Sequence, residues 1–407
     1  SDRHPEKPSL WESEANRQKT IALWHKLAER YANEPWIGGY DIINEPNWGF
    51  EDAADKRGTK ETKNIPLKQL MQDITKAIRE VDKKHIIIIE GNGFGNNYNG
   101  ILPAWDNNMV MSFHKYGNFT DVASIQRFLD LREKYNLPLW MGESGENSNN
   151  WFTNTIRMVE SNDIGWAWWQ LKKIGINNPL EIRINPGYQA ILDYWNGKGP
   201  APSPEEAYKA LLEFVRNTRL ENTVYHKDVT DAMFRQVASA AAIPFKEHVI
   251  GNKAVIRAVD YDLGRNGSAY ADADTASYHY TPGVNTQGNR GHAYRNDGVD
   301  IKNEGNEFYV FHTESGEWLQ YTAQVATAGN YTLRVKVAAD EDTAGARFSI
   351  SSNGKILAAG IPVPAGSGWQ AVTLKNIPLP KGTNRIRMEF VQGGARFSEI
   401  AFERNQE

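Results

Sequence analysis

The feature that most constrains the fold of this chain is the alternation of short apolar runs with amphipathic segments over its first half. Five short apolar runs predict strands at 36–43, 85–90, 109–113, 137–142 and 164–169. Segments with helical periodicity lie before, between and after these runs, at 12–33, 67–82, 121–136, 149–161 and 186–195. Strands that alternate with helices in this way predict βαβ units and a parallel sheet.

Polar side chains recur at the C-terminal ends of the predicted strands. They are Asn44, Glu45, Glu90, His114, Tyr116, Glu143 and Trp169. A (β/α)8 barrel builds its active site from several strand ends, whereas a doubly wound sheet, the alternative, gathers its site at one switch point. The spread of polar groups over successive strands therefore favours a TIM barrel. Only five strands are visible, so we expect strands 4–8 of the barrel here and the first three outside this chain.

The pattern changes in the second half of the chain. Gly-Pro-Ala-Pro-Ser-Pro at 199–204 indicates a linker or turn, and 205–242 is mostly helical in pattern. From about residue 252, alternating runs such as 331–337 are separated by Gly, Asn and Pro, which predicts an antiparallel β-sandwich. The expected class is therefore α/β plus all-β. Its expected parts are a partial barrel at 1–200, a helical extension or linker at 201–250 and a sandwich at 251–407.

Charge and composition exclude several classes of function. The net charge is −4 with acidic and basic residues interspersed, so no basic patch indicates nucleic acid or anionic lipid. The longest apolar run, Ile86–Ile89, is too short to span a membrane. The absence of cysteine excludes disulfides, thiolate catalysis and Cys-ligated metals. The 13 Trp and 17 Tyr residues favour sugar binding, because flat aromatic faces stack on sugar rings.

Two Glu residues stand at the ends of different predicted strands. Glu45 lies in Ile-Ile-Asn-Glu-Pro-Asn and Glu143 lies in Leu-Trp-Met-Gly-Glu-Ser-Gly. In a barrel both side chains would point into the same mouth. Hydrolysis of a glycosidic bond requires two carboxyl groups that flank it. The alternative is a pair of structural Glu residues with partners, because a buried carboxylate without a partner is costly.

Further polar and aromatic residues accompany the two carboxylates. His114 and Tyr116 lie between them in sequence, in Phe-His-Lys-Tyr-Gly. A Tyr hydroxyl can hold a nucleophile in place, and a His can adjust the protonation state of an acid. Trp166, Trp168 and Trp169 share the last strand, where alternation predicts that one or two of them belong to the core. No second His lies at ligand spacing from the first, so we expect no catalytic metal.

Taken in order, Asn-Glu-Pro, His-Lys-Tyr, Gly-Glu-Ser and the Trp-rich strand resemble glycoside hydrolase family 5, the endoglucanase-like clan of (β/α)8 barrels, over about 11–196. The resemblance implies that Glu45 is the acid/base and Glu143 the nucleophile of a double displacement with retention. That mechanism implies carboxyl groups about 5–5.5 Å apart. The implied substrate-binding residues are Asn44, His114, Tyr116, Trp169 and, just beyond the last strand, Lys173. The family also uses an early Arg and usually a third-strand His, to which no residue here is assigned.

A second resemblance covers about 252–403. The runs 258–267, 293–301 and 316–322 are similar to carbohydrate-binding module family 6. That family binds sugar between two loop aromatics, and Tyr270 and Trp369 fall at those positions.

This chain departs from the module family at two places. Where the family often has two Glu residues for a structural calcium, the chain has Arg257 and Val259. Where an Asn and an Asp are common near the C-terminus, it has Arg396 and Ser398. The sequence therefore leaves two points open: whether this module binds calcium, and whether it makes the usual contact with its ligand. A module that mainly stabilises the enzyme, or that binds through another face, is the alternative.

These resemblances imply a secreted, bacterial, monomeric endo-β-1,4-glucanase that acts on plant-type β-glucan without a cofactor. Alternative substrates are xyloglucan, mixed-linkage glucan and mannan, because loop residues decide among them. An alternative from another class is a non-catalytic carbohydrate-binding protein, since five strands cannot close a barrel.

Overall fold

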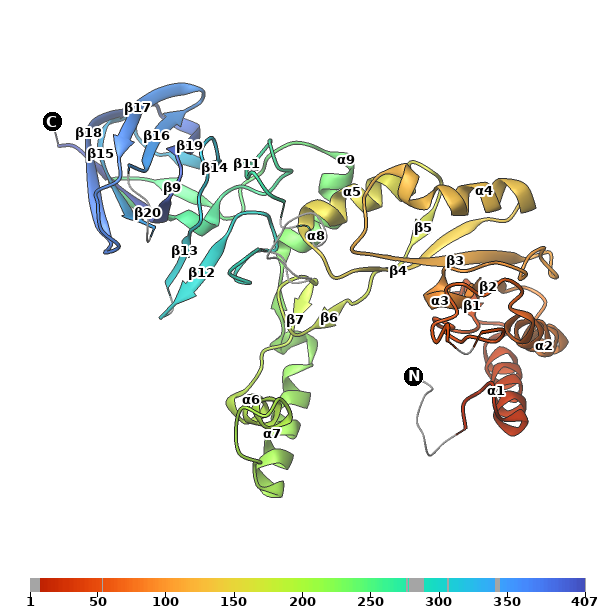
Figure 1. Cartoon of the computed structure of the whole chain (residues 1–407). Helices are drawn as coiled ribbons and strands as arrows, with labels where there is room; N and C mark the ends of the chain where they lie inside the picture. The colour runs from red at the N-terminus through yellow and green to blue at the C-terminus, as the bar shows by residue number, and fades with distance from the viewer. Residues whose placement is uncertain are drawn as a thin grey trace. The chain divides into compact units, whose positions relative to one another are not determined.

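A computed structural model of the chain describes residues 8–52, 54–275, 277, 289–305, 307–340 and 345–406. The described residues pack as two compact units (Figure 1). The first unit takes its residues from 1–116, 121–144 and 158–168, and the second from 117–120, 145–157 and 169–407. The boundaries drawn from the sequence at residues 200 and 250 stay a prediction.

The first unit is built on a five-stranded sheet whose strands follow one another in sequence order. The strands are β1 (Gly39–Asp41), β2 (Ile86–Glu90), β3 (Met109–Tyr116), β4 (Leu139–Gly145) and β5 (Gly165–Trp166). The β1–β2, β2–β3 and β4–β5 pairs are parallel. This uninterrupted order confirms the half-barrel arrangement, because a doubly wound sheet would reverse its strand order.

The helices of the first unit lie close to the predicted segments. They are α1 (Glu14–Tyr31), α2 (Ile65–Val81), the one-turn α3 (Asn92–Gly95), the 3-10 turn η1 (Val122–Ile125) and α4 (Gln126–Tyr135). The sequence pattern of α2 explains its position, because residues three and four apart share one helix face. Its buried side chains include Leu67, Leu70, Met71, Ile74 and Ile78. The side chains of the strands complete this core, with Ile87, Ile89 and Met111 fully buried.

The helix α5 (Asn149–Glu160) begins in the second unit. Two further helices of that unit, α6 (Pro186–Trp195) and α7 (Pro204–Asn217), pair through the stacked rings of Tyr188 and Phe214, with centroids 4.0 Å apart. The region predicted as mostly helical also holds η2 (Leu220–Asn222), α8 (Lys227–Met233) and α9 (Arg235–Ala238). A small sheet was not predicted, because its strands of two residues show no periodicity. Its strands are β6 (Lys172–Lys173), β7 (Leu180–Glu181) and β8 (Val224–Tyr225).

The rest of the second unit is the predicted β-sandwich. One sheet contains β12 (Ile301–Glu304), β13 (Glu307–Val310), β20 (Ala395–Arg404), β15 (Gly329–Ala339) and β18 (Gln370–Leu379), with β10 (Lys253–Arg257) also paired to β20. The other contains β11 (Tyr270–Ala271), β14 (Trp318–Val325), β19 (Gly382–Gln392), β16 (Arg347–Ser352) and β17 (Lys355–Pro362). Here β9 (His248–Ile250) pairs with β14 in parallel, and the remaining recorded pairs are antiparallel. A 3-10 turn, η3 (Ala258–Asp260), follows β10.

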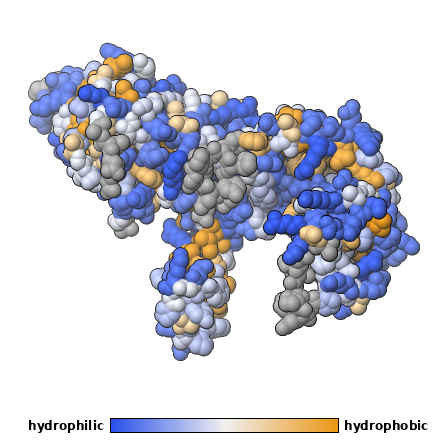
Figure 2. All heavy atoms as spheres, viewed as in Figure 1, coloured by the Kyte–Doolittle hydropathy of each residue, from blue (hydrophilic) through white to orange (hydrophobic). Residues whose placement is uncertain are grey.

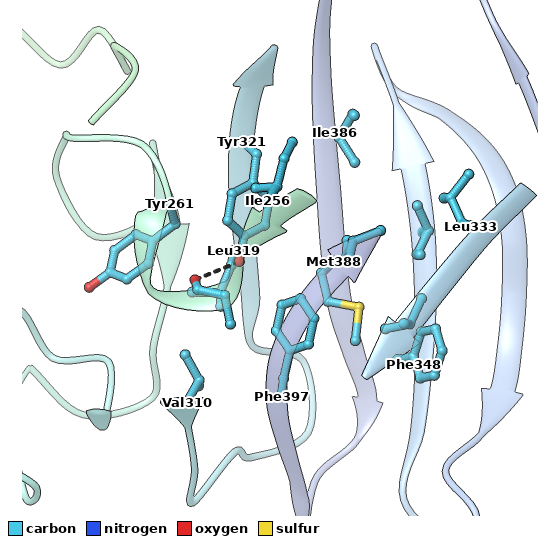
Figure 3. Packing of buried hydrophobic residues seen from close by; sticks show 14 of the residues in the cluster. Ile256, Tyr261, Val310, Leu319, Tyr321, Leu333, Phe348, Ile386, Met388 and Phe397 are labelled. Atoms are coloured by element: carbon cyan, nitrogen blue, oxygen red, sulfur yellow. Dashed lines mark hydrogen bonds between the residues drawn. The ribbon is translucent and has the colours of Figure 1, made fainter. Parts of the chain in front are cut away.

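The sandwich core comes from the inward-facing residues of both sheets (Figure 3). Leu333 on β15, Phe348 on β16 and Phe397 on β20 are fully buried. The Tyr321 hydroxyl donates a hydrogen bond of 2.7 Å to the Ala258 carbonyl, so this buried ring keeps its polar end satisfied. Hydrophilic residues cover most of the visible face in Figure 2. In the described part of the chain, no helix is both long and apolar enough to cross a membrane.

Candidate active site

Glu45 follows the first strand of the half-barrel and has a fixed backbone. Its φ is 45°, a left-handed conformation that is costly for a residue with a side chain and that recurs at functional sites. Its N–H donates a hydrogen bond of 2.7 Å to Oε2 of Glu90, at the end of β2. The preceding residue, Asn44, is exposed. The strained turn therefore presents the Glu45 carboxyl group in a defined direction.

His114 on β3 connects the carboxyl groups of this site. Its Nδ1 lies 2.7 Å from Glu45 Oε1 and 3.5 Å from Glu143 Oε2, and its Nε2 lies 3.1 Å from Glu90 Oε1. Burial alone would lower the pKa of His114, but contacts with Glu45 and Glu90 and the charge of Glu143 outweigh burial and raise the pKa to about 10. The ring is therefore an imidazolium at neutral pH and donates from both nitrogens.

Glu143 lies on β4, and its carboxyl group accepts a hydrogen bond of 2.9 Å from the Tyr116 hydroxyl. Burial raises the pKa of Glu143, while the charge of His114 and the hydrogen bond from Tyr116 act in the opposite direction. The net direction is upward, and the charge of His114 and the Tyr116 hydrogen bond limit this rise and so help to keep the carboxylate form that a nucleophile requires.

Gly142, directly before Glu143, leaves room for these contacts. A Cβ atom at this position would lie 2.3 Å from the Ser112 Oγ and 3.4 Å from His114 Nε2. Any side chain here would clash with the Ser112 hydroxyl, so glycine before Glu143 is a packing requirement of this site.

Two carboxyl groups of the site were not assigned a role from the sequence. Glu90 is fully buried and contacts both Glu45 and His114. Burial, and then the neighbouring charge of Glu90, raise the pKa of Asp41 on β1 to about 8. Asp41 is therefore protonated at neutral pH and hydrogen-bonds Glu90. The sequence signal for Glu90 was its place after four consecutive Ile residues, where a carboxyl group needs a partner. We call Asp41, Glu45, Glu90, His114 and Glu143 the catalytic cluster.

The two predicted catalytic carboxyl groups are close together. One side-chain atom from each of three residues, Glu45, His114 and Glu143, lies within 4.8 Å of the other two. Such a group could hold a metal ion only if the His nitrogen were deprotonated. In this protein both nitrogens face carboxylates, and the raised pKa keeps the proton on the ring. The donor set therefore fits a metal poorly, and catalysis without a metal stays a prediction.

The other predicted substrate residues belong to the second unit. Trp169 is 45% exposed, while Trp166 and Trp168 pack against the core of the first unit, as the alternation predicted for part of the set. Lys173 on β6 forms an ion pair of 2.8 Å with Glu146, so its ammonium group already has a partner.

In the sandwich, the structure contradicts the prediction for Tyr270. Its ring is 2% exposed and belongs to the hydrophobic core, so neither face can stack on a sugar. The ring that does lie beside Trp369 is Tyr309, with centroids 5.1 Å apart in an edge-to-face arrangement. Arg396 and Lys336 contact the Trp369 ring as cations. A pocket of about 460 Å³ is lined by residues that include Tyr309 and Arg396.

The positions implied for a structural calcium hold no carboxylate. The Arg257 guanidinium lies over the rings of Tyr294 and Phe308, and Val259 is fully buried in the core. Calcium takes six to eight oxygen ligands. A calcium ion in this module would therefore need other residues.

Comparisons with known proteins agree with this geometry. Residues 2–175 match the family model for Cellulase (glycosyl hydrolase family 5), and residues 295–400 match the model for Carbohydrate binding module (family 35). The chain therefore carries a glycoside hydrolase family 5 cellulase domain and a carbohydrate-binding module. This match is to family 35, whereas the residues resemble family 6, so the assignment to family 6 stays a prediction.

Curated relatives are distant. The chain is 22% identical over 256 residues to a β-xylosidase of Phanerodontia chrysosporium, which covers 51% of this chain and 50% of the relative. It is also 22% identical over 228 residues to Endoglucanase C of Acetivibrio thermocellus, which covers 41% of this chain and 63% of the relative. The chain thus spans 50% to 63% of the length of these relatives.

Solved structures with local similarity are also distant. Endoglucanase Cel5A from Thermotoga maritima has 21% identity and a TM-score of 0.32, and the match covers 41% of this chain and 62% of that chain. The C-terminal CBM6 of LamC from Zobellia galactanivorans has 21% identity and a TM-score of 0.24, and the match covers 26% of this chain and 88% of that chain.

Proposed function

We propose that this chain acts as a retaining endo-β-1,4-glucanase. The observation that carries the proposal is the position of Glu45 and Glu143 on either side of His114, with one oxygen from each carboxyl group within 4.8 Å of the other. Retaining glycosidases need a separation of about 5–5.5 Å between carboxyl groups, whereas inverting enzymes need room for a water molecule. The short separation supports retention.

The geometry assigns a role to each group in the first step. The Glu143 carboxylate attacks the anomeric carbon, and the bond to the leaving glycosidic oxygen breaks while Glu45 donates a proton to that oxygen. Because Oε1 of Glu45 accepts the His114 hydrogen bond, the transferable proton belongs on Oε2. The product is a glycosyl ester of Glu143, and the Tyr116 hydroxyl stays beside that carboxyl group.

The second step restores the enzyme. Glu45, now ionised, removes a proton from a water molecule, which attacks the anomeric carbon and displaces Glu143 as a carboxylate. The hydrogen bonds from His114 to Glu45 and from Tyr116 to Glu143 are already in place, so the protein does not need to reorganise when negative charge moves between the two carboxyl groups.

The preference for a β-1,4-glucan rests on the family match and on the names of distant relatives, two of which are endoglucanases. Xyloglucan, mixed-linkage glucan and mannan are the alternatives. We also propose that the protein is secreted and monomeric, because its polymeric substrate lies outside the cell. The motifs at 258–267, 293–301 and 316–322 support assignment of the module to family 6.

A direct test is the release of reducing ends from soluble cellulose derivative, mixed-linkage glucan, xyloglucan and mannan. The intact chain and a Glu143→Gln variant should be compared. We expect activity on the cellulose derivative that the variant lacks. Equal activity of the two proteins would reject the assignment of Glu143, and a higher rate on mannan would change the substrate.

A second candidate function is binding of carbohydrate without catalysis. The observation that favours it is that, within the described residues, β1 pairs only with β2 and β5 only with β4 in this sheet, so these strands do not close a barrel. Binding of the chain to polysaccharide without release of any reducing ends would support this candidate.

A further inference from the structure

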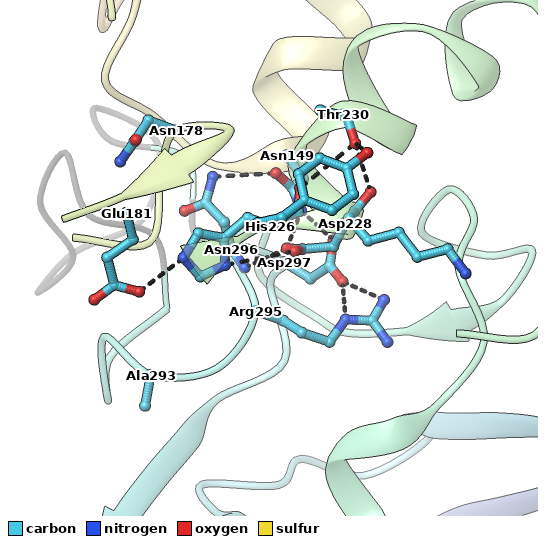
Figure 4. A network of polar contacts seen from close by, with 12 residues as sticks. Asn149, Asn178, Glu181, His226, Asp228, Thr230, Ala293, Arg295, Asn296 and Asp297 are labelled. Atoms are coloured by element: carbon cyan, nitrogen blue, oxygen red, sulfur yellow. Dashed lines mark hydrogen bonds and ion pairs between the residues drawn. The ribbon is translucent and has the colours of Figure 1, made fainter. Parts of the chain in front are cut away.

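A second group of buried polar residues lies in the second unit and shares no residue with the catalytic cluster. It joins the start of α5, the start of α8 and a loop of the sandwich (Figure 4). We call it the Asn149 network. Its members are Asn147, Ser148, Asn149, Asp228, Arg295, Asn296 and Asp297, each no more than 2% exposed.

Asn296 of the sandwich loop contacts the segment before α5 at several points. Its side-chain Nδ2 donates hydrogen bonds to the Asn147 carbonyl at 2.8 Å and to Asn149 Oδ1 at 3.2 Å. Its carbonyl accepts the Asn149 N–H at 2.8 Å. Three hydrogen bonds from one residue fix both the position and the direction of this segment.

Asp228 of α8 completes the contact. Its Oδ2 accepts the Asn296 N–H at 2.8 Å and the Asn149 Nδ2 at 2.8 Å. One carboxylate oxygen therefore ties the sandwich loop and α5 to a third element. Thr153 on α5 also donates to the Ala232 carbonyl on α8, at 2.8 Å.

A buried ion pair supports these bonds from the sandwich side. Asp297 Oδ1 accepts Asn149 Nδ2 at 3.0 Å, and Asp297 Oδ2 lies 2.6 Å from Arg295 Nη2. The Arg295 guanidinium lies 3.6 Å from the centroid of the Tyr261 ring. Buried charges persist only when they are paired and hydrogen-bonded, and such networks make an arrangement rigid.

The segment held by the network directly follows the proposed nucleophile. β4 carries Glu143 and ends at Gly145, and residues 145–157 pack with the sandwich and α8 as parts of one compact unit. Gly145 forms a backbone bridge with Trp169, and the adjacent Glu146 pairs with Lys173. The end of the nucleophile strand is thus anchored where the Asn149 network begins.

We propose that Asp228 and Asn296 are positioning residues for Glu143, because they hold the segment that directly follows it in the chain. The proposal rests on the proposed role of Glu143. It goes beyond sugar binding, because it gives the module a role in hydrolysis of substrates too short to reach a separate binding site.

The test uses the intact chain and an aryl β-cellobioside, with rates expressed per folded molecule. Asp228→Ala and Asn296→Ala remove hydrogen bonds to the segment, so each should lower kcat about tenfold or more while KM changes less than about threefold. Asp228→Asn can keep an oxygen at the Oδ2 position and should retain kcat within about threefold. The matched control is Asn330→Ala, at an exposed position of β15, which should leave kcat unchanged.

Unchanged kcat per folded molecule in both alanine variants would overturn the proposal, as would an equal loss in Asp228→Asn and Asp228→Ala. Because the alanine variants can fail to fold, calorimetry of the unaltered chain is the second measurement. We expect the sandwich and the cellobiosidase activity to be lost in one transition. Two separate transitions, with activity that survives unfolding of the sandwich, would overturn the proposal. An unaltered chain without any hydrolytic activity would instead reject the proposed function.

Discussion

The catalytic cluster is partly buried and the Asn149 network is fully buried, and the two groups of polar residues balance charge differently. In the catalytic cluster four carboxyl groups surround a single imidazolium, and the pKa of Asp41 rises to about 8. In the Asn149 network two carboxylates accept hydrogen bonds from amide, backbone and guanidinium donors. The first arrangement places several carboxyl groups around one cation, whereas in the second each carboxylate accepts hydrogen bonds from several donors.

This difference separates function from framework. A site for acid and base chemistry needs carboxyl groups whose environments give them unequal proton affinity. A framework needs donors and acceptors that match, because an unmatched buried group is costly. Burial of polar groups therefore does not by itself mark an active site, whereas a surplus of carboxyl groups around one cation does.

The variant with the largest expected effect disrupts the Asn149 network. Arg295→Met leaves Asp297 as an uncompensated buried charge and should lower the free energy of unfolding by about 3–5 kcal/mol. Urea denaturation at neutral pH measures the change. The matched control is Arg334→Met, which breaks the exposed pair with Glu403 and should shift the midpoint little. Equal shifts in the two variants would contradict the structural role of the network.

The next effect changes the catalytic cluster without removing a proposed catalytic group. In the unaltered chain the Glu45 N–H and the protonated His114 Nε2 both point to oxygens of Glu90. Glu90→Gln replaces one of these oxygens by an NH2 group, which then faces a donor instead of an acceptor. We expect kcat to fall about 100-fold with the fold intact. The exposed Glu80→Gln variant on α2 serves as control. A rate within about threefold of the unaltered chain would show that Glu90 does not position the site.

A smaller effect concerns the pH profile. Glu143 must be ionised to attack, and the hydrogen bond from Tyr116 lowers its pKa. Tyr116→Phe removes this donor, so the pKa of Glu143 rises. The acidic limb of the pH–activity profile should therefore shift to higher pH. We expect about a tenfold loss of kcat as well. The profile of kcat/KM on an aryl cellobioside reports this limb, and Tyr208→Phe, which alters an exposed ring, should not move it.

The smallest effect is a pH dependence of stability. The pKa of His114 is about 10 in the folded protein and about 6.5 in an unfolded chain. Its contribution to stability is therefore complete below about pH 6.5 and is lost as the pH rises toward 10. The melting temperature of the unaltered chain, measured relative to His114→Gln, should fall by a few degrees between pH 7 and pH 10. A constant difference across this range would contradict a charged His114.

Sequence reasoning identified those features that depend on periodicity and local motifs. Alternating strands and helices gave the half-barrel, and the strand ends brought Glu45, His114 and Glu143 together, because parallel strands end at one edge. The roles of Asp41 and Glu90 depend on strand register and on side-chain contacts across the sheet, neither of which the sequence records.

The errors also have physical reasons. Tyr270 was assigned to a loop, but it pairs with Leu319 of β14 and faces the core, so its ring is covered. The Asn149 network joins residues about 150 positions apart, and none of its motifs is distinctive alone. Long-range polar contacts of this kind follow from packing, so only the structure reveals them.

The most direct test of the account is the anomeric configuration of the first product, followed by proton NMR during hydrolysis of a soluble cello-oligosaccharide by the intact chain. The closeness of Glu45 and Glu143 predicts that the β-anomer forms first and converts to the α-anomer by mutarotation, and that Glu143→Gln forms neither. Initial release of the α-anomer would show inversion and would contradict the assignment of Glu143 as the nucleophile.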